Sequence, residues 1–310
     1  MTRSLLTLLW LMPGICLLTA SMSLAREFSV DEVAPGVYVH QGSHEQMNLL
    51  NQGDINNSGF IVGRNAVAVI DPGGSVSVGA KLRRYLESVT DVPVKYIVLT
   101  HFHPDHVLGA AAFSKDVEIL AHRNYPRAVT QRAVFYRERF AELVGGSPDA
   151  FRQPDRTIQS VETIDLGDRM LQLEAHPVAH TDNDLSVLDL STGTWWASDL
   201  VFSDRTPALD GSLSGWLQLL TDRDQDTIKL IVPGHGAPGD WQSTVEPQEQ
   251  YLRQIQSTVR AQIAEGLSIS EVVAAAESEE NSGEAGDYWR LFDEQHPTNL
   301  IKAYTELEWE

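Results

Sequence analysis

The sequence predicts an α/β protein in which two mixed β-sheets pack together and helices cover them. Two observations lead to this class. Short apolar runs of strand length occur in two series along the chain, and each series leads into a stretch with helical spacing of apolar residues. The chain also has 310 residues, 42% of them hydrophobic, which is enough to bury a core between such layers.

The first series fills the amino-terminal half. Gly63-Arg64-Asn65 separates two apolar runs and predicts a hairpin, while Val78, Leu82 and Leu86 share one helical face. In order, the predicted elements are an edge strand (36–41), the two hairpin strands (59–63 and 66–71), a helix (76–88), a buried strand (96–99), a helix starting near His106, a strand (118–121) and a long helix (123–144).

The second series follows the same plan. Thr192-Gly193 supplies a turn between two of its strands, and Ser268 with Glu271 three residues later is a typical helix start. The predicted elements are four strands (170–175, 185–190, 194–197 and 230–232), two helices (245–265 and 268–276) and an acidic, glycine-containing loop (277–286).

The amino terminus has the pattern of a secretory signal over residues 1–25. Arg3 gives a positive start, and residues 5–18 are apolar but too short for a spanning helix. Ser23-Leu24-Ala25 fits a cleavage site, so the mature chain is expected to begin at Arg26 and to be periplasmic or secreted, without stable insertion in the membrane. An uncleaved anchor is the alternative.

Cysteine content and charge narrow the chemistry and the partners. Cys16 is the only cysteine, so a cleaved chain has no thiolate to offer as ligand or nucleophile. The net charge is −20, which makes nucleic acid and anionic membrane surfaces poor partners. A solvated acidic surface and a cationic periplasmic partner both remain compatible with this charge.

A cluster of metal-ligand side chains follows the predicted strand 96–99. His101 and His103 are two residues apart in an extended segment, so they point the same way and can reach one metal. Pro104 turns the chain, which lets Asp105 and His106 reach a second metal. Imidazole and carboxylate are ligands that hold zinc, so the cluster predicts a two-zinc site.

Three further candidates, His180, Asp199 and His235, each follow a strand-like run. The preferred assignment places His180 with the first metal, His235 with the second and Asp199 between both. The predicted ligand set is therefore His101, His103 and His180, then Asp105, His106 and His235, with Asp199 as the bridge. Open positions remain for a bridging water, as a catalytic site requires, and iron or manganese could replace zinc.

These motifs, in this order, resemble the metallo-β-lactamase-fold superfamily over about residues 33–239. The resemblance implies a four-layer αββα sandwich, with a catalytic domain over residues 26–240 and a helical C-terminal extension, residues 241–310, packed on the same domain. Asp71 could cap a turn. The resemblance instead favours a role in which Asp71 orients a ligand imidazole by contacting it on the side away from the metal. Members hydrolyse lactams, thioesters, lactones and phosphoesters, and some are iron oxygenases, so the fold does not settle the substrate.

A finer resemblance points to the exported metallohydrolases of quinoprotein relay systems and sulfur-oxidation (Sox) clusters. It is carried by the segments 34–42, 53–55, 57–63, 205–213, 292–297 and 306–310. One departure from the superfamily's β-lactamases is informative, because Asp199 stands where those enzymes place a cysteine. This argues against a dedicated β-lactamase.

Together these features predict an exported dinuclear zinc hydrolase that acts on a small molecule. A metal-bridging hydroxide, oriented by Asp105 and Asp199, would attack an ester, thioester or lactam carbonyl. Arg205 and Trp216, downstream of Asp199, are candidates for substrate contact, with ordinary loop packing as the alternative. Three other functions stay open: a mononuclear iron persulfide oxygenase, a β-lactamase, and a non-catalytic periplasmic accessory or metal-binding protein.

Overall fold

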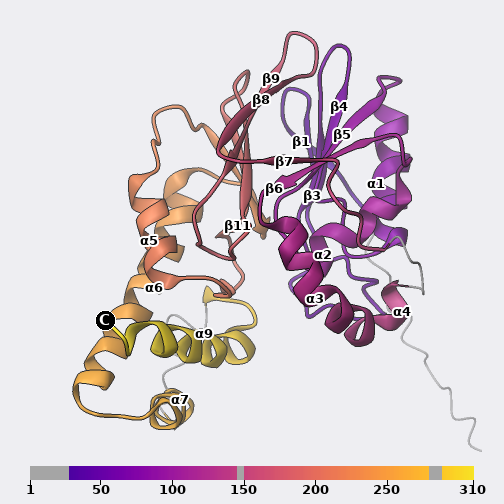
Figure 1. The fold of residues 1–310 in the computed structure, drawn as a ribbon. Coiled ribbons are helices and arrows are strands. Elements are labelled where there is room, and N and C mark those ends of the chain that lie inside the picture. Colours follow the sequence, from indigo (N-terminus) through magenta and orange to yellow (C-terminus); the bar gives the residue numbers. More distant parts are fainter. Residues whose placement is uncertain (1–27, 145–149, 279–287) are drawn as a thin grey trace, which may run out of the picture.

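The computed structural model describes residues 28–144, 150–278 and 288–310 (Figure 1). The predicted signal peptide lies outside these residues, as does most of the loop predicted over 277–286. Within the described residues, no helix is both long enough and apolar enough to cross a bilayer.

Two β-sheets form the middle of the molecule. The first follows chain order: β1 (Asp31–Ala34), β2 (Val37–His40), β3 (Ser58–Val62), β4 (Val67–Ile70), β5 (Val94–Leu99), β6 (Glu118–His122) and β7 (Arg156–Ile158). The second has the order β12-β11-β10-β9-β8, from β8 (Val161–Asp165), β9 (Met170–Ala175), β10 (Leu185–Asp189), β11 (Thr194–Phe202) and β12 (Leu230–His235). Both sheets are mixed, because β4 to β7 and the pair β11–β12 are parallel while the other pairs are antiparallel.

Helices cover the outer face of each sheet (Figure 1). The first sheet carries α1 (Val76–Val89), α2 (Pro104–Val107), a 3₁₀ turn (Leu108–Ala112), α3 (Tyr125–Arg139) and α4 (Ala141–Val144). On the side of the second sheet lie α5 (Leu213–Asp222), α6 (Trp241–Ala264), α7 (Ile269–Ser278) and α9 (Phe292–Leu307). The predicted four-layer αββα sandwich with C-terminal helices is confirmed.

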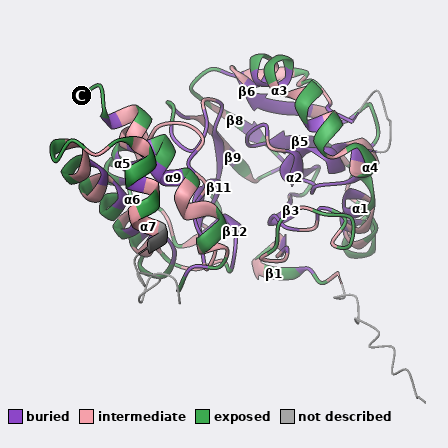
Figure 2. Cartoon of the chain, turned by 90° about the horizontal axis from the view of Figure 1, so that it is seen from below, coloured by how far each residue is buried: buried purple, intermediate pink, exposed green. Residues whose placement is uncertain are grey.

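Alternating residues of the central strands explain the layers. In β3, Phe60 belongs to the core under the helices of the first sheet, whereas Ile61 belongs to the core between the sheets. In β11, Trp195 faces the helices of the second sheet and Trp196 faces the other sheet. Figure 2 colours these strands mainly as buried. Burial of successive residues, which point to opposite faces, is why the strands read as continuous apolar runs.

The structure differs from the predicted elements in two ways. The helix predicted over 123–144 is broken at Phe140, whose backbone leaves the helical region at φ −120° and ψ 34°. The strands β1, β7 and β8 and the helices α5 and α9 were not predicted. The three strands are short and partly exposed, so they lack an apolar run, and Gly215 and Pro297 interrupt the helical pattern of α5 and α9.

Arg169 ties the two sheets together at one end. Its guanidinium donates to the carbonyl oxygens of Val62 and Pro35 at 2.9 Å and to the carboxylate of Asp189 at 2.7 Å. Asp189 is fully buried and Arg169 nearly so. Burial raises the pKa of Asp189, but hydrogen bonds from Arg169 and Thr192 outweigh burial and hold this pKa below its usual value.

Replacing Arg169 with methionine should therefore destabilise the fold by about 3 kcal/mol at pH 7, because it leaves a buried carboxylate without its cation. The difference from wild type should shrink as the pH falls toward 4, since the unpaired buried Asp189 of the variant can then take up a proton. It should shrink further below pH 4, where the native carboxylate, whose pKa is held below its usual value, is protonated as well. Urea unfolding at several pH values measures both effects. The control is Arg64→Met, whose pair with Asp168 is exposed and should contribute little.

Candidate metal centre

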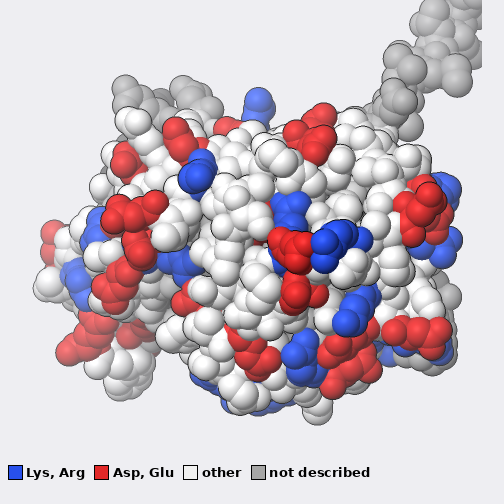
Figure 3. Space-filling model, turned by 90° about the horizontal axis from the view of Figure 1, so that it is seen from above, with Lys and Arg blue, Asp and Glu red and all other residues white. Residues whose placement is uncertain are grey.

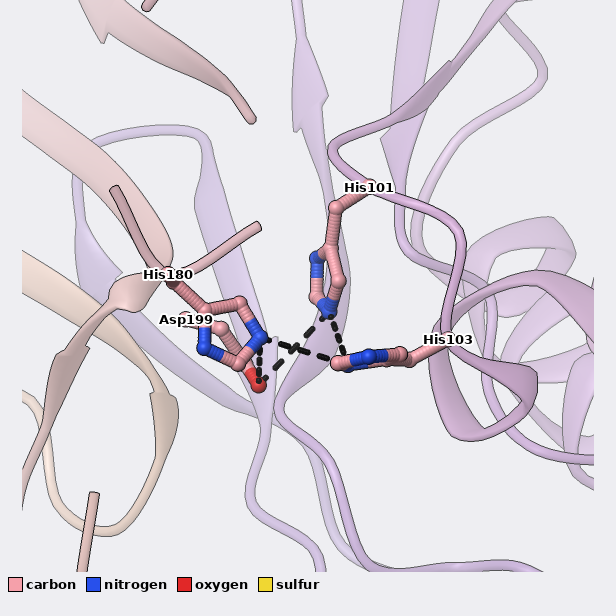
Figure 4. Close-up of side chains that lie close together, drawn as sticks. All are labelled: His101, His103, His180 and Asp199. Atoms are coloured by element: carbon pink, nitrogen blue, oxygen red, sulfur yellow. Dashed lines mark hydrogen bonds and ion pairs between the residues drawn. The ribbon is translucent and has the colours of Figure 1, made fainter. Parts of the chain in front are cut away.

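The predicted ligands converge where the strand ends of the two sheets meet. Figure 4 shows four of them, His101, His103, His180 and Asp199. His101 and His103 lie in the turn after β5, and Asp105 and His106 in α2, which Pro104 begins. From the second sheet, His180 lies in the loop between β9 and β10, Asp199 lies in β11, and His235 ends β12. Asn183 joins the two sides, because its side-chain oxygen accepts the backbone N–H of Phe102 at 2.8 Å.

The first group is His101, His103, His180 and Asp199. His103 Nδ1 lies 3.0 Å from His101 Nε2 and 3.2 Å from His180 Nε2. Asp199 Oδ2 lies 3.6 Å from His101 Nε2 and 3.3 Å from His180 Nε2. Tetrahedral zinc with ligands at 2.0–2.1 Å requires ligand atoms about 3.3 Å apart. The four atoms therefore have the spacing of a metal site.

The second group is Asp105, His106 and His235. Asp105 Oδ2 lies 3.5 Å from Nε2 of both histidines. Asp199 reaches this group as well, with Oδ1 at 3.1 Å from His106 Nε2 and Oδ2 at 3.5 Å from His235 Nε2. His106 Nε2 and Asp199 Oδ1 are buried atoms without a hydrogen-bond partner. Buried polar atoms normally have partners, so this pair fits a cation between them.

Each ligand imidazole is oriented by an acceptor on its other nitrogen. His180 Nδ1 faces the carbonyl oxygen of Ala208 at 2.6 Å, and His235 Nδ1 faces that of Ile55 at 2.7 Å. His101 Nδ1 lies 3.0 Å from the hydroxyl of Thr100. These contacts place the proton on Nδ1 and leave Nε2 free to bind metal.

His103 has the opposite arrangement. Its Nδ1 faces the first group, and its Nε2 lies 3.3 Å from Oδ2 of Asp210. Asp210 also pairs with Arg132 of α3 and with Lys302 of α9. Sequence reasoning did not select Asp210, because an aspartate before Gly211 has the ordinary pattern of a turn.

Asp71 holds the second group from behind. Its carboxylate accepts the backbone N–H of Thr100 at 2.9 Å and the hydroxyls of Thr100 and Ser198 at 2.7 Å. His106 Nδ1 donates to the same carboxylate at 2.9 Å. Asp71 is fully buried and adopts a left-handed backbone with φ of 45°. The contact with His106 is the one expected of a residue that orients a ligand imidazole.

Burial and the carboxylates act in opposite directions on the imidazoles. Burial lowers the pKa of His101 and His235 and brings that of His180 to about 4, so these rings are neutral at pH 7 and can ligate a metal. Burial also lowers the pKa of His106, but Asp199, Asp105 and Asp71 outweigh it and raise this pKa well above its usual value. The second group is therefore a place where a positive charge is strongly favoured.

Gly234 allows β11 and β12 to approach at the bridging carboxylate. A Cβ atom on Gly234 would lie 1.8 Å from Oδ1 of Asp199 and 2.7 Å from its backbone nitrogen. Gly234→Ala should therefore displace Asp199 and lower metal content and activity together. Elemental analysis of the purified variant measures the loss. The control is Gly266→Ala, which is strained by its φ of 83° but meets no atom within 4 Å, so it should affect stability alone.

The two residues predicted to contact substrate have different positions. Arg205 is partly buried beside the second group, with Nη1 at 3.0 Å from His235 Nδ1. Trp216 is fully buried under the first group, where its ring packs edge-on against His180 at 5.4 Å and its indole N–H donates to the Leu200 carbonyl. A substrate contact at Trp216 is therefore wrong, because this side chain packs behind a ligand.

Comparisons with known proteins agree with this architecture. A model of the metallo-beta-lactamase superfamily matches residues 51–235. The chain is 39% identical over 51 residues to a linear primary-alkylsulfatase from Pseudomonas sp., a stretch that spans 10% of that relative's length.

Two solved structures share the fold. A metallo-beta-lactamase from Pontibacter korlensis has a TM-score of 0.59 and 20% identity, covering 73% of this chain and 99% of that one. The inverting sec-alkylsulfatase Pisa1 from Pseudomonas sp. has a TM-score of 0.69 and 16% identity, covering 90% of this chain and 50% of that one. With the sequence model spanning more than half of its residues and the ligand cluster in place, the chain belongs to the metallo-beta-lactamase superfamily.

Proposed function

We propose that this protein is a dinuclear zinc hydrolase that acts on an ester, thioester or lactam carbonyl. The observation that carries the proposal is that Asp199 lies between two groups of imidazole and carboxylate ligands, with Oδ2 near His180 of the first group and Oδ1 near His106 of the second. Two zinc ions held there would lower the pKa of a bound water to near neutrality and polarise the substrate carbonyl.

The chain's own carboxylates have a defined part in this reaction. Asp105 and Asp199 border the same space as the ligand nitrogens, and both are ionised because neighbouring histidines outweigh the effect of burial on their pKa and hold it below the usual value. Ionised carboxylates accept hydrogen bonds from the attacking water. They thereby orient the water, and they can receive its proton. The imidazole contacts behind them limit how far either ligand group can move.

The position of Arg205 favours a substrate that carries a negative charge near the scissile bond. His235 Nδ1–H is directed at the carbonyl oxygen of Ile55, so it offers no lone pair to the neighbouring guanidinium. Among the described residues, Arg205 forms no ion pair with a carboxylate. Its N–H groups are therefore free to bind a carboxylate or sulfate of the substrate.

A sulfate ester is the second candidate substrate. Arg205 favours it, because a guanidinium binds planar pairs of anionic oxygens well, and two of the similar proteins are alkylsulfatases by name. The other candidates have less support. A mononuclear iron persulfide oxygenase or a non-catalytic accessory protein would not need both ligand groups, and a β-lactamase role is disfavoured by Asp199 in place of a cysteine.

Export and metabolic context form the last part of the proposal. The signal pattern over residues 1–25 supports a periplasmic or secreted protein. The resemblance of segments such as 34–42 and 205–213 to exported metallohydrolases supports a link to quinoprotein or sulfur-oxidation metabolism. On the face drawn in Figure 3, acidic and basic side chains are interspersed. The net charge of −20 nevertheless favours a cationic periplasmic partner over an anionic one.

One experiment tests the catalytic proposal. The purified protein should contain about two zinc ions per chain by elemental analysis. It should hydrolyse at least one member of a panel of thioesters, carboxylate esters, lactones, β-lactams and alkyl sulfates, and chelation should remove this activity. Iron in place of zinc, with oxygen uptake in the presence of a persulfide, would support the oxygenase instead. Bound metal with no turnover across the panel would contradict the proposal.

A further inference from the structure

The helix α9 contacts a segment of the chain that contains two hydrogen-bond acceptors for ligand imidazoles, the Ala208 carbonyl and the Asp210 carboxylate. We call residues 207–214 the strap, which runs from Pro207 to the first residues of α5. Three polar side chains of α9 contact it, namely Asn299, Lys302 and Glu306. Their spacing of three and four residues places them on one face of the helix.

Each of the three side chains binds a different part of the strap. Asn299 is fully buried, accepts the backbone N–H of Leu209 at 3.0 Å and donates to the carbonyl of Pro207 at 2.7 Å. Lys302 lies 3.3 Å from the carboxylate of Asp210. The Glu306 carboxylate accepts the backbone N–H groups of residues 213 and 214 at 2.7 and 2.9 Å, where α5 begins.

The strap in turn positions the first ligand group. The Ala208 carbonyl receives the Nδ1 proton of His180, and Asp210 faces Nε2 of His103. The backbone N–H of Asp210 also donates to the carbonyl of His180 at 3.1 Å. The second ligand group depends on other parts of the chain, because Asp71 orients His106 and Ile55 orients His235.

We propose that α9 is a positioning element of the metal centre, whose polar face sets the metal affinity of the group formed by His101, His103 and His180. This inference rests on the proposed function, since it assumes that the centre binds metal. The contacts of α9 act through the strap on two of the three imidazoles in the first group. The second group has no such connection, so the effect of α9 is selective.

The test separates the two groups by removing one at a time. In a His235→Ala background the remaining binding step reports on the first group, and in a His180→Ala background it reports on the second. Asn299→Ala and Lys302→Ala are introduced into each background, and zinc affinity is measured by competition with a chromophoric chelator. The matched control is Thr305→Ala, an exposed residue of α9 that bonds only within its own helix.

Asn299→Ala should weaken zinc binding by about tenfold or more in the His235→Ala background, as removal of outer contacts to metal ligands typically does. Lys302→Ala should act in the same direction with a smaller effect, because its side chain is partly exposed. Neither change should alter binding in the His180→Ala background. Lys302 is a surface residue, so its variant keeps the test valid if Asn299→Ala fails to fold.

Two results would overturn the inference. Equal loss of affinity in both backgrounds would show general loosening of the fold, and unchanged affinity in both would show that α9 has no part in the centre. If the wild-type protein binds no metal, the proposed function fails by itself. Ring ¹⁵N chemical shifts of His103 and His180 in the metal-free protein then decide about α9: a change in Asn299→Ala but not in Thr305→Ala supports its positioning role, and no change refutes it.

Discussion

Replacing Asp199 with asparagine is expected to reduce turnover more than about 100-fold, which exceeds the usual effect of changing a residue behind a metal ligand. Asparagine has nearly the same size, so the packing of β11 against Gly234 is kept. It has only one acceptor oxygen, however, whereas Asp199 directs Oδ1 toward His106 and Oδ2 toward His180. The amide nitrogen would face one of the two ligand groups and could not bind a cation there.

The substitution should lower the metal content as well as the turnover rate. Elemental analysis should find fewer than two metals per chain in Asp199→Asn, and added zinc should restore little activity. Asp222→Asn is the matched control, since Asp222 is an exposed residue of α5 whose carboxylate accepts from Gln218 of the same helix. A variant that keeps both metals and wild-type turnover would show that Asp199 does not bridge them.

The predictable part of the fold is the part with a strong apolar pattern. The strands β4, β5 and β10 are buried on both faces and lie almost where they were expected. Strands β7 and β8 are exposed on one side and contain Arg156 and Glu162, so nothing local marks them as strands. Their place in the sheets depends on pairing with β6 and β9, which a local pattern does not contain.

The candidate site shows the same division. His101, His103, Asp105 and His106 are close in sequence, so their spacing alone predicted a shared site. His180, Asp199 and His235 could be placed because each follows a strand. Asp210 and Lys302 could not, because Lys302 is 92 residues from Asp210 and acts only through the packing of α9. The predicted substrate contact at Trp216 failed for a related reason, since sequence order does not show that the indole of Trp216 in α5 faces the core.

Asp71 provides the second large expected effect, this time on stability and metal binding together. Asp71→Ala removes a buried carboxylate that accepts from Thr100, Ser198 and His106, and leaves these donors without a partner. Loss of one partner in a buried charged network costs about 3–5 kcal/mol. Alanine is also strained at a φ of 45°. We expect a fall in the free energy of unfolding of that size, measured by urea denaturation, together with loss of metal from the second group.

Asp71→Asn separates these two effects. Asparagine tolerates the left-handed backbone, and the hydroxyls of Thr100 and Ser198 can rotate to donate to or accept from an amide. The His106 ring cannot adapt in this way, because binding metal through Nε2 fixes a proton on Nδ1, and an amide has one oxygen to share between Thr100 N–H and His106. Asp71→Asn should therefore fold with a smaller loss of stability and still bind zinc about 10–100-fold more weakly at the second group. If this variant bound zinc as tightly as wild type, Asp71 would only support the turn, and the orientation of His106 would have to come from the surrounding packing.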